Sequence, residues 1–142
     1  MNGNQNEIEE VASLEKTVFT HPWTYEMILA SVESEYDRVK TITVEGRLIG
    51  YVIYSVVCDS TDLLRVAVDP DERRHGVGAE LLEFMLKDCA DRAVENIFLE
   101  VRESNFPAIS LYKKYGFVEI SRRKKYYTSP VEDGIVMQKK IK

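Results

Sequence analysis

Two arginines and two glycines stand together where a predicted strand gives way to a predicted helix, in the segment Arg73-Arg74-His75-Gly76-Val77-Gly78. Glycine lets the backbone approach a ligand without a Cβ atom in the way. The first N–H groups of a helix lack partners within it and carry the positive end of the helix dipole. Such a helix start suits a diphosphate, to which Arg73 and Arg74 can add charge-assisted hydrogen bonds. An ordinary helix start with two flexible residues is the alternative interpretation.

Two other phosphate-binding motifs do not fit this segment. A dinucleotide fingerprint needs a third glycine, and Leu81 occupies that position. A P-loop needs a Gly-Lys-Ser/Thr sequence, which this segment lacks. The sequence therefore disfavours a dinucleotide-binding fold and a P-loop enzyme.

The N-terminal part of the chain indicates two helices with a break between them. Asn6 followed by Glu9 is typical of a helix start. Pro22 interrupts this helix, because proline lacks a backbone donor and restricts the residue before it. Thr24 can cap a second helix that runs to about Tyr36. The side chains expected to face inward are Ile8, Val11, Ala12, Val18, Phe19, Ile28 and Val32.

The pattern then changes from helical to strand-like. Glu45-Gly46 predicts a hairpin turn, Asp69-Pro70 ends a strand and Gly116 ends a helix. The order α-α-β-β-β-α-β-α-β-β predicts an α/β (α+β) domain, with a mixed central sheet of six or seven strands and helices on both faces. The expected strands are 39–44, 48–58, 63–68, 97–101, 117–127 and 135–141, and the later helices are 76–93 and 107–115.

Composition limits the class of protein. A chain of 142 residues with 44% hydrophobic and 30% charged residues is typical of one globular domain. The net charge of −5 argues against nucleic acid as the main partner and permits a basic substrate. The basic segment 122–125 is either a solvated strand edge or part of a site.

The cysteines and histidines are few. Cys58 and Cys89 are far apart, which argues against a disulfide framework and favours a reduced, cytoplasmic setting. With only His21 and His75 besides, no metal site is expected. We also expect no membrane partner, because the chain has no run of 18 apolar residues.

A later stretch places Glu100 in a predicted strand, Asn105 in the following loop and Tyr112 in the next helix. Together with the turn at 73–79, this stretch resembles the GNAT superfamily of acetyl-CoA-dependent N-acetyltransferases. Within the superfamily it is most similar to the ribosomal-protein-alanine N-acetyltransferase (RimI) type. The resemblance covers residues 21–137 and rests on several separated motifs that occur in the right order.

The resemblance implies a fold, a cosubstrate and a set of site residues. It implies one N-acetyltransferase domain over residues 1–142, with acetyl-CoA as cosubstrate and no metal. Glu100 matches the general base and Tyr112 the general acid. Segment 122–127, with Tyr126 and Tyr127, is similar to the basic–tyrosine segment near the acceptor site. Beyond the resemblance itself, we expect Trp23 to lie opposite these tyrosines across an acceptor slot. The residues implied to contact the cosubstrate are Val66, Ala67, Val68, Arg73, Arg74, His75, Gly76, Val77, Gly78, Ala79 and Asn105.

Simpler structural roles are open for several of these residues. Glu100 can point to solvent, Tyr112 can pack in the core, and Asn105 can merely cap a helix. Trp23 fits a core or lid aromatic as well as a substrate contact. One departure from the family pattern is Gly134, where alanine is typical after the aspartate, and it bears on the shape of the acceptor edge.

Acetyl transfer from a thioester to an amine needs a neutral amine, a stabilised oxyanion and a protonated leaving thiolate. The resemblance implies that Glu100 takes the amine proton, that N–H groups along residues 66–68 polarise the thioester, and that Tyr112 protonates the sulfur. No enzyme nucleophile is required, so the absence of a Cys–His or Ser–His arrangement is no objection.

The resemblance also implies the acceptor, the N-terminal α-amine of a protein, with an alanine-type terminus of a ribosomal protein as the example. Independently, an α-amine has a reference pKa near 8 and lysine one near 10.4, so the neutral α-amine is easier to form by about 3 kcal/mol. Two alternatives stay open: an acetyltransferase of a small amine (polyamine, amino acid or antibiotic) and a non-catalytic acetyl-CoA-binding module. We expect a monomer or weak dimer.

Overall fold

The computed structural model describes residues 4–141, and it confirms the predicted order of elements. The helices are α1 (Gln5–Val18), α2 (Tyr25–Glu33), α3 (Val77–Asp91) and α4 (Phe106–Lys114), with a short 3₁₀ turn at Pro70–Glu72. The strands are β1 (Asp37–Val44), β2 (Arg47–Val57), β3 (Ser60–Val68), β4 (Asn96–Arg102), β5 (Val118–Tyr127) and β6 (Glu132–Lys140).

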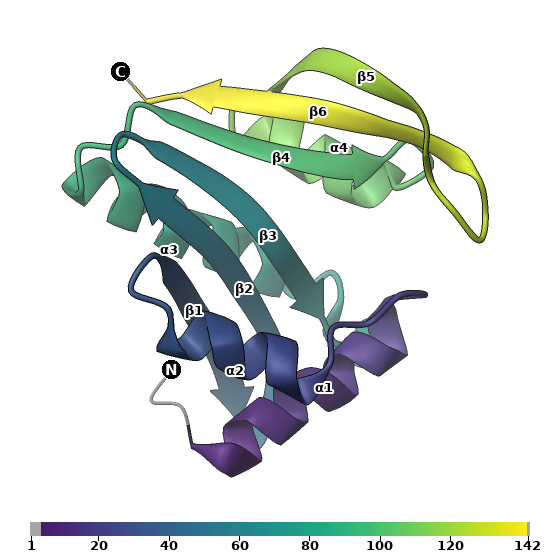
Figure 1. The fold of residues 1–142 in the computed structure, drawn as a ribbon. Coiled ribbons are helices and arrows are strands. Elements are labelled where there is room, and N and C mark those ends of the chain that lie inside the picture. Colours follow the sequence, from purple (N-terminus) through teal and green to yellow (C-terminus); the bar gives the residue numbers. More distant parts are fainter. Residues whose placement is uncertain (1–3, 142) are drawn as a thin grey trace.

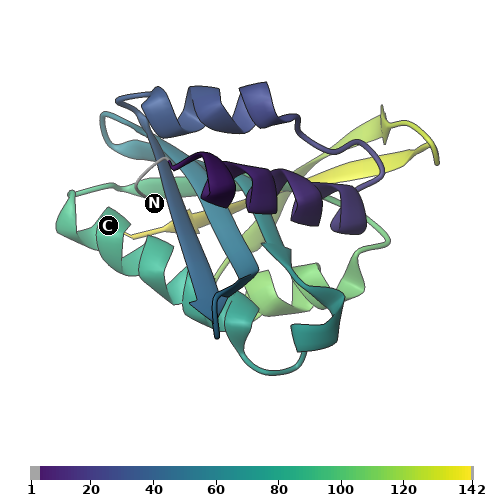
Figure 2. The same ribbon diagram turned by 90° about the horizontal axis from the view of Figure 1, so that it is seen from below.

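The strands form one six-stranded sheet in the order β1-β2-β3-β4-β6-β5. Only the β3–β4 pair is parallel; the other neighbours are antiparallel. Helices α1 and α2 cover one face of the sheet, and α3 and α4 cover the other (Figures 1 and 2). The prediction of a mixed sheet with helices on both faces is therefore confirmed.

The ends of the first two helices differ from prediction. Asn4, not Asn6, caps α1, because its Oδ1 accepts the backbone N–H of Glu7 at 3.0 Å. Thr24 caps α2 as predicted, but α2 stops at Glu33. The chain turns there because the Ser34 hydroxyl accepts the N–H of Tyr36, and β1 begins one residue later.

Each face of the sheet has its own apolar core. The first contains Ile8 and Val11 of α1 with residues of α2, β2 and β3, and the second contains residues of α3 and α4 with the sheet's other face. Gly50 allows α3 to approach closely, because a Cβ there would lie 2.9 Å from a Val77 methyl and 3.1 Å from the Ala67 carbonyl oxygen. Within residues 4–141, no helix is long and apolar enough to cross a membrane.

A buried carboxylate joins the N-terminal helices to the sheet. The Glu15 side chain on α1 is fully buried, and its Oε1 accepts the Trp23 backbone N–H at 2.7 Å. Arg65 on β3 donates to both oxygens, with Nη2–Oε1 at 2.5 Å and Nε–Oε2 at 3.2 Å. The Tyr51 hydroxyl also donates to Oε2, and burial and this hydrogen bond raise the pKa of Tyr51. Since all these donors share one carboxylate, it connects α1, the α1–α2 loop, β2 and β3.

We predict that Glu15→Ala lowers the free energy of unfolding by about 3 kcal/mol, because it leaves Arg65 without its buried partner. Urea denaturation followed by circular dichroism measures this. The matched control is Glu9→Ala on the exposed side of α1, which should change stability by no more than about 0.5 kcal/mol. Equal losses in the two variants would contradict the prediction.

Candidate active site

The sheet opens between its two central strands. The β3–β4 ladder consists of three residue pairs and ends at Asp62 and Phe98. Just beyond it, the register of β3 against β2 shifts, leaving Leu64 as an extra residue between Leu63 and Arg65. A bulge of this kind bends and twists a strand. The two strands accordingly diverge toward their carboxyl ends (Figure 1).

A cavity of about 910 Å³ occupies this opening. It is lined by β3, β4, α4 and β5, together with the α1–α2 loop. The sequence-predicted residues that line it are Val66, Arg73, Glu100, Asn105, Tyr112, Tyr126 and Tyr127. Segments far apart in the chain therefore bring the predicted base, the predicted acid and part of the predicted binding residues to one place, whereas Trp23, Ala67, Val68 and residues 74–79 do not line the cavity.

The edge of β3 offers backbone groups to the cavity. The Asp69 N–H donates to Ile49 of β2, and successive residues of a strand direct their N–H groups to opposite edges. Val68 and Val66 therefore turn their N–H and C=O groups toward β4, whose ladder with β3 has already ended. Ala67 turns its own groups toward β2, so this residue is not presented to the opening.

The turn before α3 has the geometry of an anion site. Gly76 has a φ of 79° and precedes the helix, which explains a glycine at this position. The first helical hydrogen bond runs from Glu80 N–H to Gly76 C=O at 3.0 Å. The N–H groups of Val77, Gly78 and Ala79 come before it, and no side chain caps them. Within the described residues, this helix start therefore has backbone donors without a side-chain cap.

Within residues 4–141, some charged side chains around this turn form ion pairs and others do not. Arg47 binds Asp69 Oδ2 at 2.7 Å and Glu72 Oε1 at 2.9 Å. The Nδ1 atom of His75 lies 3.3 Å from Glu72 Oε2, so this ring contacts an acid rather than the helix start. Arg73 and Arg74 are exposed and form no ion pair within residues 4–141. Two exposed cations without a partner in the described chain therefore precede the helix start.

Glu100 on β4 points into the cavity rather than to solvent. Its Oε1 lies 3.2 Å from Arg123 Nη2, and its side chain is 28% exposed. Its Oε2 is buried and, within the described chain, has no hydrogen-bond partner. A buried carboxylate oxygen without a donor is costly unless a ligand or water supplies one.

Tyr112 on α4 both packs and lines the cavity. Its ring contacts Phe117, with centroids 5.8 Å apart, and the residue is 5% exposed. Burial and the nearby Tyr127 raise the pKa of Tyr112, so its hydroxyl is protonated at neutral pH. Asn105 caps α4 by accepting the Ala108 N–H at 3.3 Å while it also lines the cavity. Its contact with a cosubstrate stays a prediction.

The aromatic residues predicted near the acceptor separate into two groups. Tyr126 and Tyr127 line the cavity, and the Arg102 guanidinium lies 4.5 Å from the Tyr127 ring centroid. Trp23 does not line it but lies beside Arg65, 5.4 Å from guanidinium carbon to ring centroid. The structure therefore favours a core role for Trp23, and its contact with substrate stays a prediction.

Two loops meet at the rim of the cavity. His21 Nε2, in the α1–α2 loop, lies 3.3 Å from the Thr128 carbonyl oxygen in the β5–β6 loop. Arg102 donates to the same oxygen at 3.1 Å and to Pro130 O at 3.0 Å. Sequence reasoning assigned no role to Arg102, Arg65 or the His21 contact, because loop-to-loop contacts leave no local pattern. The rim thus connects the two diverging halves of the sheet.

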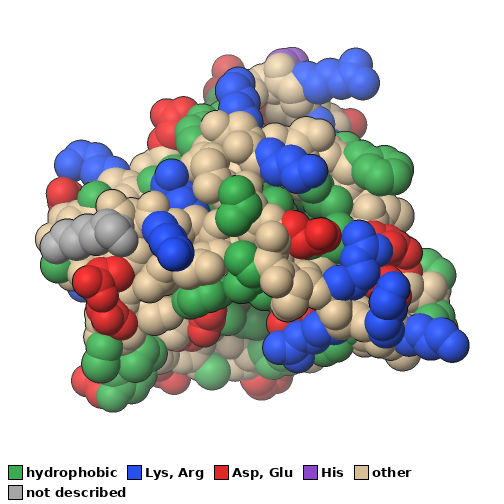
Figure 3. Space-filling model, turned by 90° about the horizontal axis from the view of Figure 1, so that it is seen from above, with side chains coloured by type: hydrophobic (Ala, Val, Ile, Leu, Met, Phe, Trp, Pro, Cys, Tyr) green, Lys and Arg blue, Asp and Glu red, His purple; other side chains and the backbone are tan. Residues whose placement is uncertain are grey.

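The basic segment of β5 is neither free nor purely solvated. Arg122 and Lys124 pair with acidic side chains, and basic and acidic groups lie side by side on the molecular face seen in Figure 3. Arg122 pairs with Glu103 at 2.6 Å, and Arg123 pairs with Glu100. The segment is therefore part of the site's polar framework.

Comparison with known proteins gives concordant results. The sequence model of the acetyltransferase (GNAT) family matches residues 8–117. The chain is 38% identical over 126 residues to the [ribosomal protein bS18]-alanine N-acetyltransferase of Escherichia coli strain K12, covering 87% of this chain and 84% of that protein. The crystal structure of the ribosomal-protein-S18-alanine N-acetyltransferase from Escherichia coli matches with a TM-score of 0.90 at 33% identity, covering 97% of this chain and 90% of that one. Ard1 from Thermoplasma volcanium matches with a TM-score of 0.87 at 31% identity, covering 98% and 94%.

We predict that replacing both Arg73 and Arg74 with glutamine raises the Kd for coenzyme A by at least about tenfold, since charge-assisted bonds to phosphate are lost. Titration calorimetry measures the Kd. Lys87→Gln is the control, because Lys87 lies on α3 away from its N-terminus and pairs with Asp91. Equal weakening by the control, or none by the arginine variant, would rule out the assigned anion site.

Proposed function

Because this chain belongs to the acetyltransferase (GNAT) family, a family of acetyl-CoA-dependent N-acetyltransferases, we propose that its acceptor is the N-terminal α-amine of a protein. The ribosomal-protein-alanine acetyltransferases among its relatives favour an alanine terminus of a ribosomal protein. The observation that carries the proposal is the cavity, which places the unpartnered Glu100 oxygen and the Tyr112 ring beside the free edge of β3. The proposal includes action in the cytoplasm, by a monomer or weak dimer.

The residues at the opening suit acetyl-CoA, whose thioester supplies the activated acetyl group. The N–H groups of residues 77–79, with Arg73 and Arg74, would hold its diphosphate. The backbone edge at Val66 and Val68 would bind its extended amide-containing arm as an added strand binds a sheet edge. From the same edge, Val66 can donate its N–H to the thioester oxygen as that oxygen gains negative charge.

Glu100 is suited to accept the proton of the acceptor amine. Oε1 pairs with Arg123, whereas Oε2 has no hydrogen-bond partner within the described residues, so Oε2 is the oxygen available to take a proton directly or through a water molecule. A carboxylate is an adequate base for an α-amine because a useful fraction of this amine is already neutral near pH 7. A lysine acceptor would demand about 3 kcal/mol more.

Tyr112 is suited to protonate the leaving sulfur. Its pKa is raised, so the phenol holds its proton at neutral pH until a strong base develops beside it. The residue lies on α4, which follows the strand carrying Glu100, so the proposed base and acid line the cavity from adjacent elements. A direct transfer then proceeds without a covalent enzyme intermediate.

We predict that purified protein acetylates peptides beginning with alanine, and that mass spectrometry places the acetyl group on the α-amine. Peptides with internal lysines and a blocked terminus should react at least about a hundredfold more slowly, given the difference in amine pKa. Polyamines, free amino acids and aminoglycosides serve as comparison acceptors. Thiol release with small amines only would disprove the N-terminal assignment.

We predict that Glu100→Gln and Tyr112→Phe each lower kcat by about a hundredfold or more, the usual contribution of a general base or acid. Calorimetry should show that both variants still bind coenzyme A. Asp91→Asn is the matched control, because Asp91 pairs with Lys87 on α3 and does not line the cavity. Unchanged kcat in both site variants would remove the catalytic assignment.

A further inference from the structure

Tyr126 and Tyr127 are adjacent in the sequence, yet both line the cavity. In a regular strand, successive side chains point to opposite faces of the sheet. A regular β5 would therefore present only one of the two rings. Instead the rings contact each other edge to face, with centroids 5.0 Å apart. The strand must depart from regular geometry beside this pair.

The departure is a bulge in β5. The pairing with β6 shifts between Arg123 and Tyr127, so that residues 124–126 stand opposite Asp133 alone. Lys125, in the middle of the bulge, has a φ of 50°. A lysine rarely adopts this conformation because its Cβ crowds the backbone, so surrounding contacts have to hold it.

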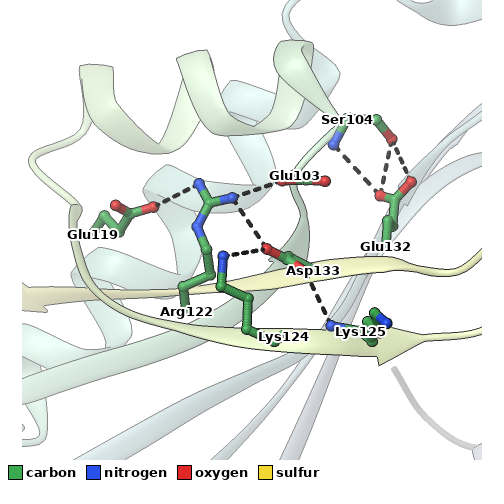
Figure 4. Close-up of polar contacts among 8 residues, drawn as sticks. All are labelled: Glu103, Ser104, Glu119, Arg122, Lys124, Lys125, Glu132 and Asp133. Atoms are coloured by element: carbon green, nitrogen blue, oxygen red, sulfur yellow. Dashed lines mark hydrogen bonds and ion pairs between the residues drawn. The ribbon is translucent and has the colours of Figure 1, made fainter.

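The side chain of Asp133 supplies contacts of this kind (Figure 4). Its Oδ1 accepts the backbone N–H of Lys125 at 3.0 Å. Its Oδ2 lies 3.3 Å from Lys124 Nζ and 3.4 Å from Arg122 Nη1. The bond from Lys125 and the charge of Lys124 lower the pKa of Asp133, which keeps it ionised at neutral pH. One carboxylate therefore contacts the backbone and a side chain of the bulge.

Contacts on either side fix the bulge relative to the end of β4. Arg122 Nη1 lies 2.6 Å from Glu103 Oε2, and its Nη2 lies 3.5 Å from Glu119 Oε1 (Figure 4). On β6, Glu132 accepts the Ser104 hydroxyl at 2.9 Å. Glu103 and Ser104 follow β4 directly, so the bulge is anchored close to the strand that carries the proposed base.

Gly134, which follows Asp133, has no side chain and so leaves space for the rings of Tyr126 and Tyr127. A Cβ at this position would lie 3.1 Å from the Tyr126 ring and 3.3 Å from the Tyr127 ring. These distances are shorter than ordinary van der Waals contact, so both rings would have to shift. Glycine at this position therefore lets both rings lie close to the β6 backbone.

We propose that Asp133 is a positioning residue for the acceptor, acting through the β5 bulge, and that Gly134 sets how far Tyr126 and Tyr127 extend into the cavity. Asp133 touches neither the cavity nor the reacting atoms; it holds the backbone that carries the acceptor wall. The inference rests on the proposed function, in which Tyr126 and Tyr127 form a wall of the acceptor site. It adds that the β5 bulge supported by Asp133 positions these two side chains.

The test is steady-state kinetics of three variants. Asp133→Ala should raise the KM for the acceptor by about tenfold, since a hydrogen bond to a charged group is lost, and leave the KM for acetyl-CoA within about twofold. Asp133→Asn keeps an oxygen for the Lys125 N–H and should stay within about threefold of wild type for the acceptor. Gly134→Ala should raise only the acceptor KM, by about threefold, through the shifted rings.

Asp91→Asn is the matched control, because it removes an exposed carboxylate that pairs with Lys87 on α3, away from the bulge, and it should leave both KM values unchanged. Equal changes in both KM values for Asp133→Ala, or an Asn variant as impaired as the Ala variant, would overturn the inference. If melting curves show that Asp133→Ala does not fold, an unchanged acceptor KM in Gly134→Ala overturns it. Wild-type protein is assayed first on peptides and small amines, and the variants are compared on whichever acceptor it uses. Wild-type activity on small amines only counts against the proposed function, whereas the comparison of the variants tests this inference alone.

Discussion

The short parallel ladder between β3 and β4 is the constraint on which the rest of the structure depends. Parallel strands normally pair along their length, but the bulge at Leu64 twists β3 away immediately after Asp62. Within the described residues, the separation leaves one edge of β3 without a paired strand beyond Asp62 and opens a cavity that Glu100 on β4 lines. A single irregularity in register thus produces both the space for a cosubstrate arm and the position of the proposed base.

An opened sheet needs other interactions to hold its two halves, and charged side chains that are buried or half-buried supply several of them. On the β3 side, the Glu15 carboxylate accepts hydrogen bonds from Arg65, Tyr51 and the Trp23 backbone N–H. On the β4 side, Arg102 donates a hydrogen bond to the loop after β5, and Asp133 accepts the backbone N–H of Lys125 in the β5 bulge. Charged groups are costly to bury unless they are fully bonded, so these contacts favour one arrangement of the surrounding backbone.

Much of the fold and of the site was predictable from the sequence because its signals are local. The helix start at Gly76 and the cap at Thr24 depend on residues that are near neighbours in the chain. The bulges at Leu64 and Lys125 were not predicted, because register is a property of two strands at once. Glu15 was also missed. It falls on the apolar face of α1, and only the partner on β3 explains a charge there.

The start of α1 shows how a local signal can still mislead. Asn4 and Asn6 are each followed three residues later by glutamate, so both satisfy the same capping pattern. The structure uses the earlier of the two. Trp23 shows how the lack of a local signal can mislead. We predicted this aromatic residue to lie near the acceptor. In the structure its backbone N–H donates to the buried Glu15 carboxylate and its ring lies beside Arg65.

The contact of His21 with the Thr128 carbonyl joins the α1–α2 loop to the β5–β6 loop at the rim of the cavity. The two loops belong to different halves of the opened sheet. This hydrogen bond therefore limits how far the two sides of the rim can move apart.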